Sequence, residues 1–235
     1  MSRIRALVSP AIRAPWLELA PQFENSSGHG LDTEWAGIAA IRKRIGEGEV
    51  FDLVVGSAAS IDELVEKKKL REKKHLAQAE AGVGVRKGAR RPDLSSVEAL
   101  KRELRAARKV GYSTGPSGVY VAGLFKRWGM AEELAPKLLL APSGVMVGTF
   151  VASGEVEFGF QQKSELLQVE GVDYAGALPA EIGLVTAFTA GLPPSGKEEK
   201  SVKSWIAFFT SPGAEPVLKK HGLEPAGVPR GRRPA

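Results

Sequence analysis

A short polar turn carries the clearest chemistry in this sequence. The segment Ser113-Thr-Gly-Pro-Ser-Gly118 follows a short stretch typical of a strand and precedes apolar residues at helical spacing. Pro116 suits the first turn of a helix, where a backbone N–H has no partner inside the helix. Such unpaired N–H groups, together with the helix dipole, favour an anion. The turn therefore indicates either an ordinary capped helix or an anion cradle at the start of that helix.

Other catalytic and metal chemistries have little support. The chain contains no cysteine, which excludes disulfides and cysteine-ligated metals. His29, His75 and His221 are scattered, without the spacing of a metal site. No G-x-S-x-G nucleophile elbow occurs, and the adjacent acids Glu132 and Glu133 would point apart on a helix. We therefore expect no metal, no cofactor and no catalytic residue.

Composition and charge indicate a soluble globular protein. Of 235 residues, 43% are hydrophobic and 26% charged, and no apolar run is long enough to span a membrane. The net charge is +6, and basic residues form runs within 67–74, 86–91 and 230–233. These runs lack interleaved aromatic residues and any nucleic-acid motif, so we expect solvated surfaces that at most attract an anionic ligand. The expected protein is a monomer without nucleic-acid partners or membrane insertion.

The elements that would position the turn begin with a repeated pattern. Within the first seventy residues, strands predicted at 3–8, 31–35 and 51–56 are each followed by a predicted helix. This order favours a parallel sheet with crossover helices, which binds ligands beside the helix N-termini. Pro21 should kink or shorten the first helix. Ser60 and Glu63 have the spacing of a capping box.

The remaining chain is also predicted to mix strands and helices. Strands are expected at 81–88, 110–112, 137–140, 154–162, 172–174 and 183–190. Helices are expected from Ser95 or Ser96 to 107, from 116 to about 128, from Ser143-Gly144 to 152, and at 198–210 and 211–220. From Gly222 onward, a tail rich in Pro, Gly and Arg should be mobile. The strand at 81–88 contains G-x-G but lacks the dinucleotide-binding fingerprint.

Together, these segments resemble the type II periplasmic binding protein fold, specifically the periplasmic molybdate-binding proteins of ABC importers. The resemblance covers residues 7 to about 223, and its main stretches are Ser9-Pro-Ala, Trp35-Ala-Gly, Ile45-Gly-Glu-Gly48, Pro116-Ser-Gly-Val-Tyr120, Gly154-Glu-Val-Glu-Phe-Gly159 and Phe208-Phe-Thr-Ser-Pro-Gly-Ala214. It implies an α/β fold of two lobes, each a mostly parallel sheet flanked by helices. Lobe 1 would contain residues 1–80 and 186–235, lobe 2 residues 81–185, and the ligand would bind in the cleft between them.

The resemblance also implies a set of ligand-binding positions. These are Ser9, Ile38, Ala39, Ser117, Gly118, Val145, Gln161 and Gln162. Ile38 and Ala39 replace a serine pair of that family, and Gln162 replaces its binding tyrosine. The backbone cradle around Ser117 is kept, with a further N–H expected at Gly144 or Val145. Because hydroxyl donors are lost, we expect a small organic carboxylate to bind better than a molybdate-like oxyanion.

The implied function is that of a solute-binding protein, not an enzyme, which captures a small anion for an ABC importer and its permease. One alternative is an enzyme on the same fold, an isomerase or decarboxylase of a carboxylate, for which Glu165 is the only nearby candidate base. Another is a cytosolic ligand sensor. The importer role implies a periplasmic location if a signal peptide has been removed; otherwise the protein would be cytoplasmic.

Overall fold

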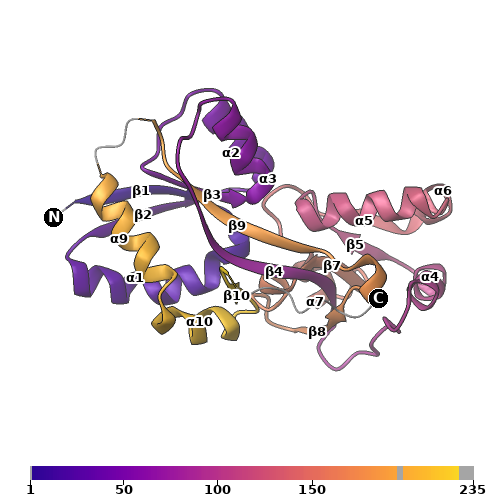
Figure 1. Cartoon of the computed structure of the whole chain (residues 1–235). Helices are drawn as coiled ribbons and strands as arrows, with labels where there is room; N and C mark the ends of the chain where they lie inside the picture. Colours follow the sequence, from indigo (N-terminus) through magenta and orange to yellow (C-terminus); the bar gives the residue numbers. More distant parts are fainter. Residues whose placement is uncertain (1, 195–197, 228–235) are drawn as a thin grey trace. The chain divides into compact units, whose positions relative to one another are not determined.

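The computed structural model describes residues 2–194 and 198–227. In this part, the chain divides into two compact units, which are described separately below. Unit 1 contains residues 2–79 and 187–227, and unit 2 contains residues 80–186. The chain leaves unit 1 within strand β4 (Lys73–Arg86) and returns within strand β9 (Val185–Gly191), as can be traced in Figure 1. No helix among the described residues is long and apolar enough to cross a membrane.

Unit 1 is a sheet with helical crossovers. Strand β1 (Arg3–Val8) pairs in parallel with β2 (Gly30–Trp35) and β3 (Leu53–Ser57), and β3 pairs antiparallel with β9. The other elements are a 3₁₀ turn (Pro10–Ile12), α1 (Arg13–Ser27), α2 (Ile38–Gly46), α3 (Ala58–Glu66), α9 (Glu199–Phe209), a second 3₁₀ turn (Pro212–Ala214), α10 (Glu215–Lys220) and β10 (Glu224–Pro225). The three strand–helix repeats predicted for the first seventy residues are confirmed.

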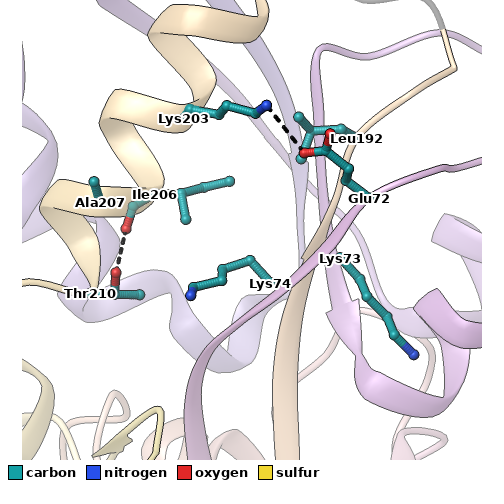
Figure 2. A pocket seen from close by; sticks show the side chains of 8 residues that line it. All are labelled: Glu72, Lys73, Lys74, Leu192, Lys203, Ile206, Ala207 and Thr210. Atoms are coloured by element: carbon teal, nitrogen blue, oxygen red, sulfur yellow. Dashed lines mark hydrogen bonds and ion pairs between the residues drawn. The ribbon is translucent and has the colours of Figure 1, made fainter.

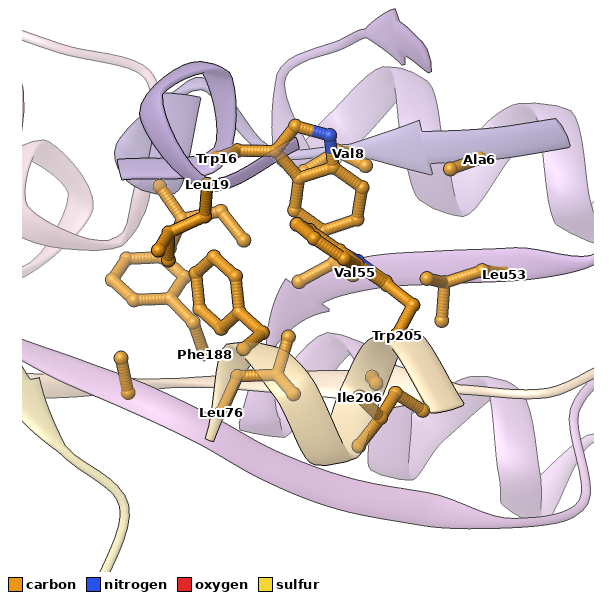
Figure 3. Close-up of a cluster of buried hydrophobic side chains, with 14 of the residues drawn as sticks. Ala6, Val8, Trp16, Leu19, Leu53, Val55, Leu76, Phe188, Trp205 and Ile206 are labelled. Carbon is orange, nitrogen blue, oxygen red and sulfur yellow. The ribbon is translucent and has the colours of Figure 1, made fainter. Parts of the chain in front are cut away.

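The core of unit 1 lies on both faces of this sheet. Alternate residues of a strand point to opposite faces, and in β1 Val8 joins one apolar cluster whereas Leu7 joins the other. On the first face, Trp16 of α1 packs edge-to-face on Trp205 of α9, with ring centroids 4.7 Å apart (Figure 3). Helices α2 and α3 cover the second face. Strand β3, which is buried on both faces, is mostly apolar, whereas β1 and β2 also carry polar residues at exposed or half-buried positions.

Unit 2 is built on a second sheet. Strand β5 (Val110–Tyr112) pairs in parallel with β6 (Leu138–Leu140) and β7 (Phe158–Gln162), and β4 pairs antiparallel with β7 and β8 (Val172–Ala177). The helices are α4 (Val97–Ala106), α5 (Pro116–Arg127), α6 (Ala131–Leu134), α7 (Val147–Ala152) and α8 (Lys163–Leu166), with 3₁₀ turns at Ala135–Lys137 and Ala180–Ile182. Because β5, β6 and β7 are parallel, α5, α7 and α8 begin at the same edge of the sheet.

The structure differs from the prediction at two points, the length of helix α1 and the cap of helix α3. Pro21 does not shorten α1, which continues to Ser27. Pro21 lies on the exposed side of the helix with Leu17, so water can replace the missing hydrogen bond to the Leu17 carbonyl. The cap of α3 is Ser57, whose Oγ accepts the N–H of Ser60, rather than Ser60 itself.

Other boundaries also differ from the prediction. Helix α7 begins at Val147, because Ser143-Gly144 forms a turn in which Gly144 has a φ of +85°. Strand β4 begins at Lys73, inside a run predicted to be a solvated charged surface. In the predicted tail, Glu224–Pro225 pairs with β4 as β10. Residues 228–235 lie outside the described part.

Candidate functional site

At the start of α5, one buried hydroxyl and two backbone N–H groups lie outside the hydrogen bonds of the helix itself. The N–H of Val119 donates to Gly115 at 3.0 Å, so the N–H groups of Ser117 and Gly118 precede the first intrahelical bond. Ser117 is only 1% exposed, and its Oγ has no hydrogen-bond partner among the described residues. Since buried hydroxyls are normally bonded, this site is suited to a ligand that accepts hydrogen bonds.

Gly118 permits a close approach at the same place. A Cβ on Gly118 would lie 1.7 Å from the carbonyl oxygen of Ser113. The turn before α5 therefore lies directly on the helix start, and it is held there by the Ser113 Oγ, which accepts the N–H of Gly115 at 3.3 Å. Only glycine leaves room for this arrangement, which explains why the sequence has Pro-Ser-Gly at the first turn.

The two glutamines that end β7 are buried rather than exposed at the surface. Gln161 and Gln162 are 2% and 1% exposed. The Oε1 of Gln161 accepts the N–H of Val147 at 2.7 Å and so caps α7. The Nε2 of Gln162 donates to Thr186 Oγ1 at 2.7 Å, whereas its Oε1 has no partner in the part of the chain that the structure describes. Gln161 thus has a structural role, whereas the side-chain oxygen of Gln162 has no partner among the described residues.

Glu165 lies in α8, four residues after Gln161 of β7. Its carboxylate accepts hydrogen bonds from the Gln161 side chain and from the backbone N–H of Gln162, which is the cap of α8. Burial raises the pKa of Glu165 to about 7, although both hydrogen bonds act to lower it. Ser164 beside it is fully buried, and its Oγ is unpartnered among the described residues. Sequence reasoning missed Ser164, because a serine in a short helix carries no distinctive signal.

The predicted positions in unit 1 lie at the edge where its parallel strands end. Ser9 follows β1 and is buried; its N–H donates to Val55 at 2.9 Å and its Oγ accepts the N–H of Ala11 at 3.4 Å. Ile38 and Ala39 begin α2, where the first intrahelical bond runs from Ile41 to Gly37, so their own N–H groups have no helical partner. Unit 1 therefore offers N–H groups and apolar side chains at these positions.

Internal contacts already engage the predicted ligand position Val145 and two aromatic residues, Tyr120 and Trp35. The N–H of Val145 donates to Pro142 at 3.0 Å, so the geometry does not support its expected role as an anion donor. The hydroxyl of Tyr120 donates to the carbonyl of Ile182 at 3.2 Å. Trp35 packs edge-to-face near Trp16, with ring centroids 6.3 Å apart. Tyr120 and Trp35 thus make internal structural contacts.

Unit 1 also contains a hollow of about 480 Å³ between the start of β4 and α9 (Figure 2). Its lining includes Glu72, Lys74, Leu192, Lys203 and Ile206. Lys203 is paired with Glu72 at 3.4 Å and also with an acid on its own helix. Lys74 has no ion pair among the described residues. One cation above apolar side chains supplies too few donors to enclose a small anion.

The charged runs show the pairing expected of solvated surfaces. Arg71 pairs with Glu199 at 2.5 Å, Arg90 pairs with Glu103 at 2.5 Å, and Lys73 pairs with an acid of α3. In residues 2–194 and 198–227, no group of three His, Cys, Asp or Glu side chains is arranged to hold a metal ion.

Comparison with known proteins identifies the family. Residues 4–224 match the family of bacterial extracellular solute-binding proteins. An aconitate isomerase from a Pseudomonas species is 30% identical over 233 residues, covering 96% of this chain and 88% of that protein. A molybdate-binding protein of Rhodobacter capsulatus is 23% identical over 224 residues, covering 92% of this chain and 86% of that protein.

The fold is also that of a solved binding protein. The periplasmic molybdate-binding protein of Azotobacter vinelandii matches with a TM-score of 0.76 and 16% identity, covering 94% of this chain and 98% of that one. This likeness confirms the α/β type II periplasmic binding protein fold that the sequence predicted. The chain belongs to the bacterial extracellular solute-binding protein family.

Proposed function

We propose that this protein binds a small organic anion bearing carboxylate groups, and that it delivers this ligand in the periplasm to the permease of an ABC importer. The observation that carries the proposal is Ser117, a buried residue at the start of α5. Its hydroxyl has no partner in the described part of the chain, and its N–H lies outside the helical bonding pattern. A carboxylate accepts several hydrogen bonds at once, and charge-assisted bonds of this kind are the strong ones.

Further donors in unit 2 lie at the same edge of the sheet. Ser164 Oγ follows β7, which is the parallel neighbour of β5, and α5 begins after β5. The Gln162 amide can rotate by half a turn without changing its shape; Thr186 would then donate to Oε1, and the NH₂ group would be free for a ligand. Together with the N–H groups of Ser117 and Gly118, these atoms form a donor set suited to carboxylate oxygens.

The choice between a carboxylate and a tetrahedral oxyanion rests mainly on unit 1. A fully buried oxyanion needs many donors, because a charge left under-bonded is costly. Ile38 is half-buried against the apolar cluster of α2 and α3, and neither Ile38 nor Ala39 carries a hydroxyl. The 30% identical relative is named for aconitate, which supports a carboxylate, whereas the molybdate-binding relatives support the oxyanion. That one ligand contacts both units stays a prediction.

A thermal-shift panel tests the proposal. It should contain aconitate and other di- and tricarboxylates beside molybdate, tungstate and sulfate. A bound ligand at a hundred times its dissociation constant stabilises the folded protein by about 2.7 kcal/mol. We expect stabilisation by at least one carboxylate and little by the oxyanions. Stabilisation by molybdate, without stabilisation by any carboxylate, would overturn the choice of ligand.

An isomerase acting on an unsaturated carboxylate is the second candidate function. Two observations favour it: the relative named aconitate isomerase, and the buried Glu165 carboxyl with a pKa near neutrality. Enzymes commonly place acid–base groups with such pKa values at their sites. Proton NMR of aconitate incubated with the protein would follow conversion between its cis and trans forms. Absence of conversion at saturating aconitate would rule out the isomerase and leave ligand binding as the only proposed function.

A further inference from the structure

Unit 2 contains a hollow of about 340 Å³ at the amino ends of β5 and β7. The chain segments meet there because Val85 of β4 is paired with Phe158 of β7, and the N–H of Glu157 donates to the carbonyl of Lys109 at 2.9 Å. Helix α5 begins after the opposite, carboxyl end of β5. The hollow is therefore separate from the site proposed around Ser117.

Three arginines and a set of apolar residues line this hollow. Val156 and Phe158 are only 1% and 4% exposed. Arg86 ends β4, Arg90 lies in the loop after it, and Arg108 lies in the segment between α4 and β5. The basic run at 86–91 supplies two of these arginines, and the fold adds the third from another part of the chain.

Many of the arginine donors in the hollow are not used. Arg90 donates from both of its Nη atoms to Glu103, at 3.0 and 2.5 Å. Arg108 donates to Glu157 at 2.7 Å through Nε, and its two Nη groups have no partner among the described residues. The side chain of Arg86 makes no hydrogen bond or ion pair within residues 2–194 and 198–227. An arginine carries five N–H donors, so Arg86 and Arg108 together offer most of theirs to a ligand.

Arg86 is also the uncompensated charge of the hollow. A Cβ on Gly154 would lie 3.4 Å from the Nη1 of Arg86, so the guanidinium lies beside the turn between α7 and β7. Acids on the neighbouring segments have other partners: Glu155 pairs with Lys109 at 3.1 Å, and Asp173 accepts a backbone N–H at 3.0 Å. An anion entering the hollow would therefore meet a cation that no acid has neutralised.

We propose that this hollow binds the phosphate group of a small molecule in solution. A phosphate presents oxygens in tetrahedral directions and carries up to two charges, so it can accept hydrogen bonds from Arg86 and Arg108 at once. A planar carboxylate with one charge matches a single arginine fork and would also lie near the Glu157 carboxylate. The apolar residues of the lining strengthen the attraction, because they lower the local dielectric constant.

Calorimetric titration of the whole chain with inorganic diphosphate at low ionic strength tests this site. We expect saturable binding by the wild type and no measurable binding of acetate. Arg86→Gln should weaken diphosphate binding by about tenfold, the equivalent of one hydrogen bond to a charged group. Arg86→Lys keeps the charge but not the fork, so its affinity should fall between the two. Arg102→Gln is the control, because it removes the same charge from the exposed side of α4, outside the hollow, and should change the affinity by less than about twofold.

Several results would overturn the inference. Absence of saturable diphosphate binding would do so directly. Equal losses in Arg86→Gln and Arg102→Gln would reveal only general attraction to a basic surface. Loss of diphosphate binding in Ser117→Ala, but not in Arg86→Gln, would place the anion at the start of α5 instead. Sedimentation with phosphatidylglycerol vesicles that depends on Arg86, without binding of diphosphate, would identify a lipid headgroup rather than a small molecule in solution.

Discussion

The side-chain oxygen of Gln161 accepts the backbone N–H of Val147 at 2.7 Å, and the same side chain donates to Glu165. One residue at the end of β7 thus fixes the start of α7 and contributes to the environment of a buried acid in α8. The consequences of this connection can be measured separately as stability, pH dependence and ligand affinity.

Gln161→Leu should lower the free energy of unfolding by about 1–3 kcal/mol. The substitution leaves the Val147 N–H without its partner and removes a donor from Glu165, and unpaired buried polar groups cost this much. Urea unfolding measures the change. Gln22→Leu on the exposed face of α1 is the matched control and should change stability by no more than about 0.5 kcal/mol. Equal effects of the two variants would show that the Gln161 contact contributes nothing.

Glu165 should make stability depend on pH near neutrality. Its pKa is about 7 in the folded protein against an ordinary value of 4.5, so between these values the folded state keeps a proton that the unfolded chain has released. The stability that this proton confers is present below about 4.5, is lost as the pH rises toward 7, and stays lost above it.

The comparison with Glu165→Gln isolates this effect. From pH 5 to pH 8, the wild type should lose about 1–3 kcal/mol relative to the variant. Acids with lowered pKa values, such as Glu18 and Glu63, act below their ordinary value of 4.5 and are common to both proteins. Parallel stability curves for the two proteins across this range would be inconsistent with a buried, titrating Glu165.

Gly118→Ala should disrupt the start of α5. The added Cβ would lie 1.7 Å from the Ser113 carbonyl oxygen, so the turn or the helix must move. We expect lower stability and loss of anion binding. Gly123→Ala in the same helix is the control, because its Cβ would meet nothing closer than the Arg127 side chain at 3.7 Å. That variant should be neutral or gain about 0.5–1 kcal/mol. Equal tolerance of both alanines would refute the close approach.

Ser117→Ala should weaken ligand binding without lowering the stability of the protein. Because the Ser117 hydroxyl has no partner in the described protein, its removal should leave the free energy of unfolding unchanged or slightly raised. Ligand affinity should nevertheless fall by about tenfold, the equivalent of one hydrogen bond to a charged group. Calorimetry and urea unfolding of the same preparation measure both quantities. A large stability loss with unchanged affinity would assign the hydroxyl a structural role instead.

The sequence was sufficient for local features but not for contacts between elements. The bounds of β1 were predicted correctly, because a short apolar-rich run is a local pattern. The start of α5 was found from the turn residues Ser113-Thr-Gly115 and from Pro116, which a first helical turn tolerates. The hydrogen bond from Val147 to Gln161 spans fourteen residues and joins a helix to a strand, so it cannot be predicted from a local sequence pattern.

The misplaced start of α7 has a similar cause. Ser143-Gly144 has the composition of a helix cap, but in the structure the N–H of Val145 turns back to the carbonyl of Pro142. The N–H of Val147, the first residue of α7, is instead bonded by the side chain of Gln161, which lies in the next strand, β7. The perturbed pKa of Glu165 likewise depends on burial in the folded unit, although its sequence position had marked it as the nearest base.

The most direct test of the central claim is a pair of calorimetric titrations of the wild-type protein, one with aconitate and one with molybdate. The carboxylate site proposed at the start of α5 predicts saturable binding of aconitate and weaker binding of molybdate by at least about tenfold, or 1.4 kcal/mol. Micromolar or tighter binding of molybdate, with no heat from aconitate, would contradict it.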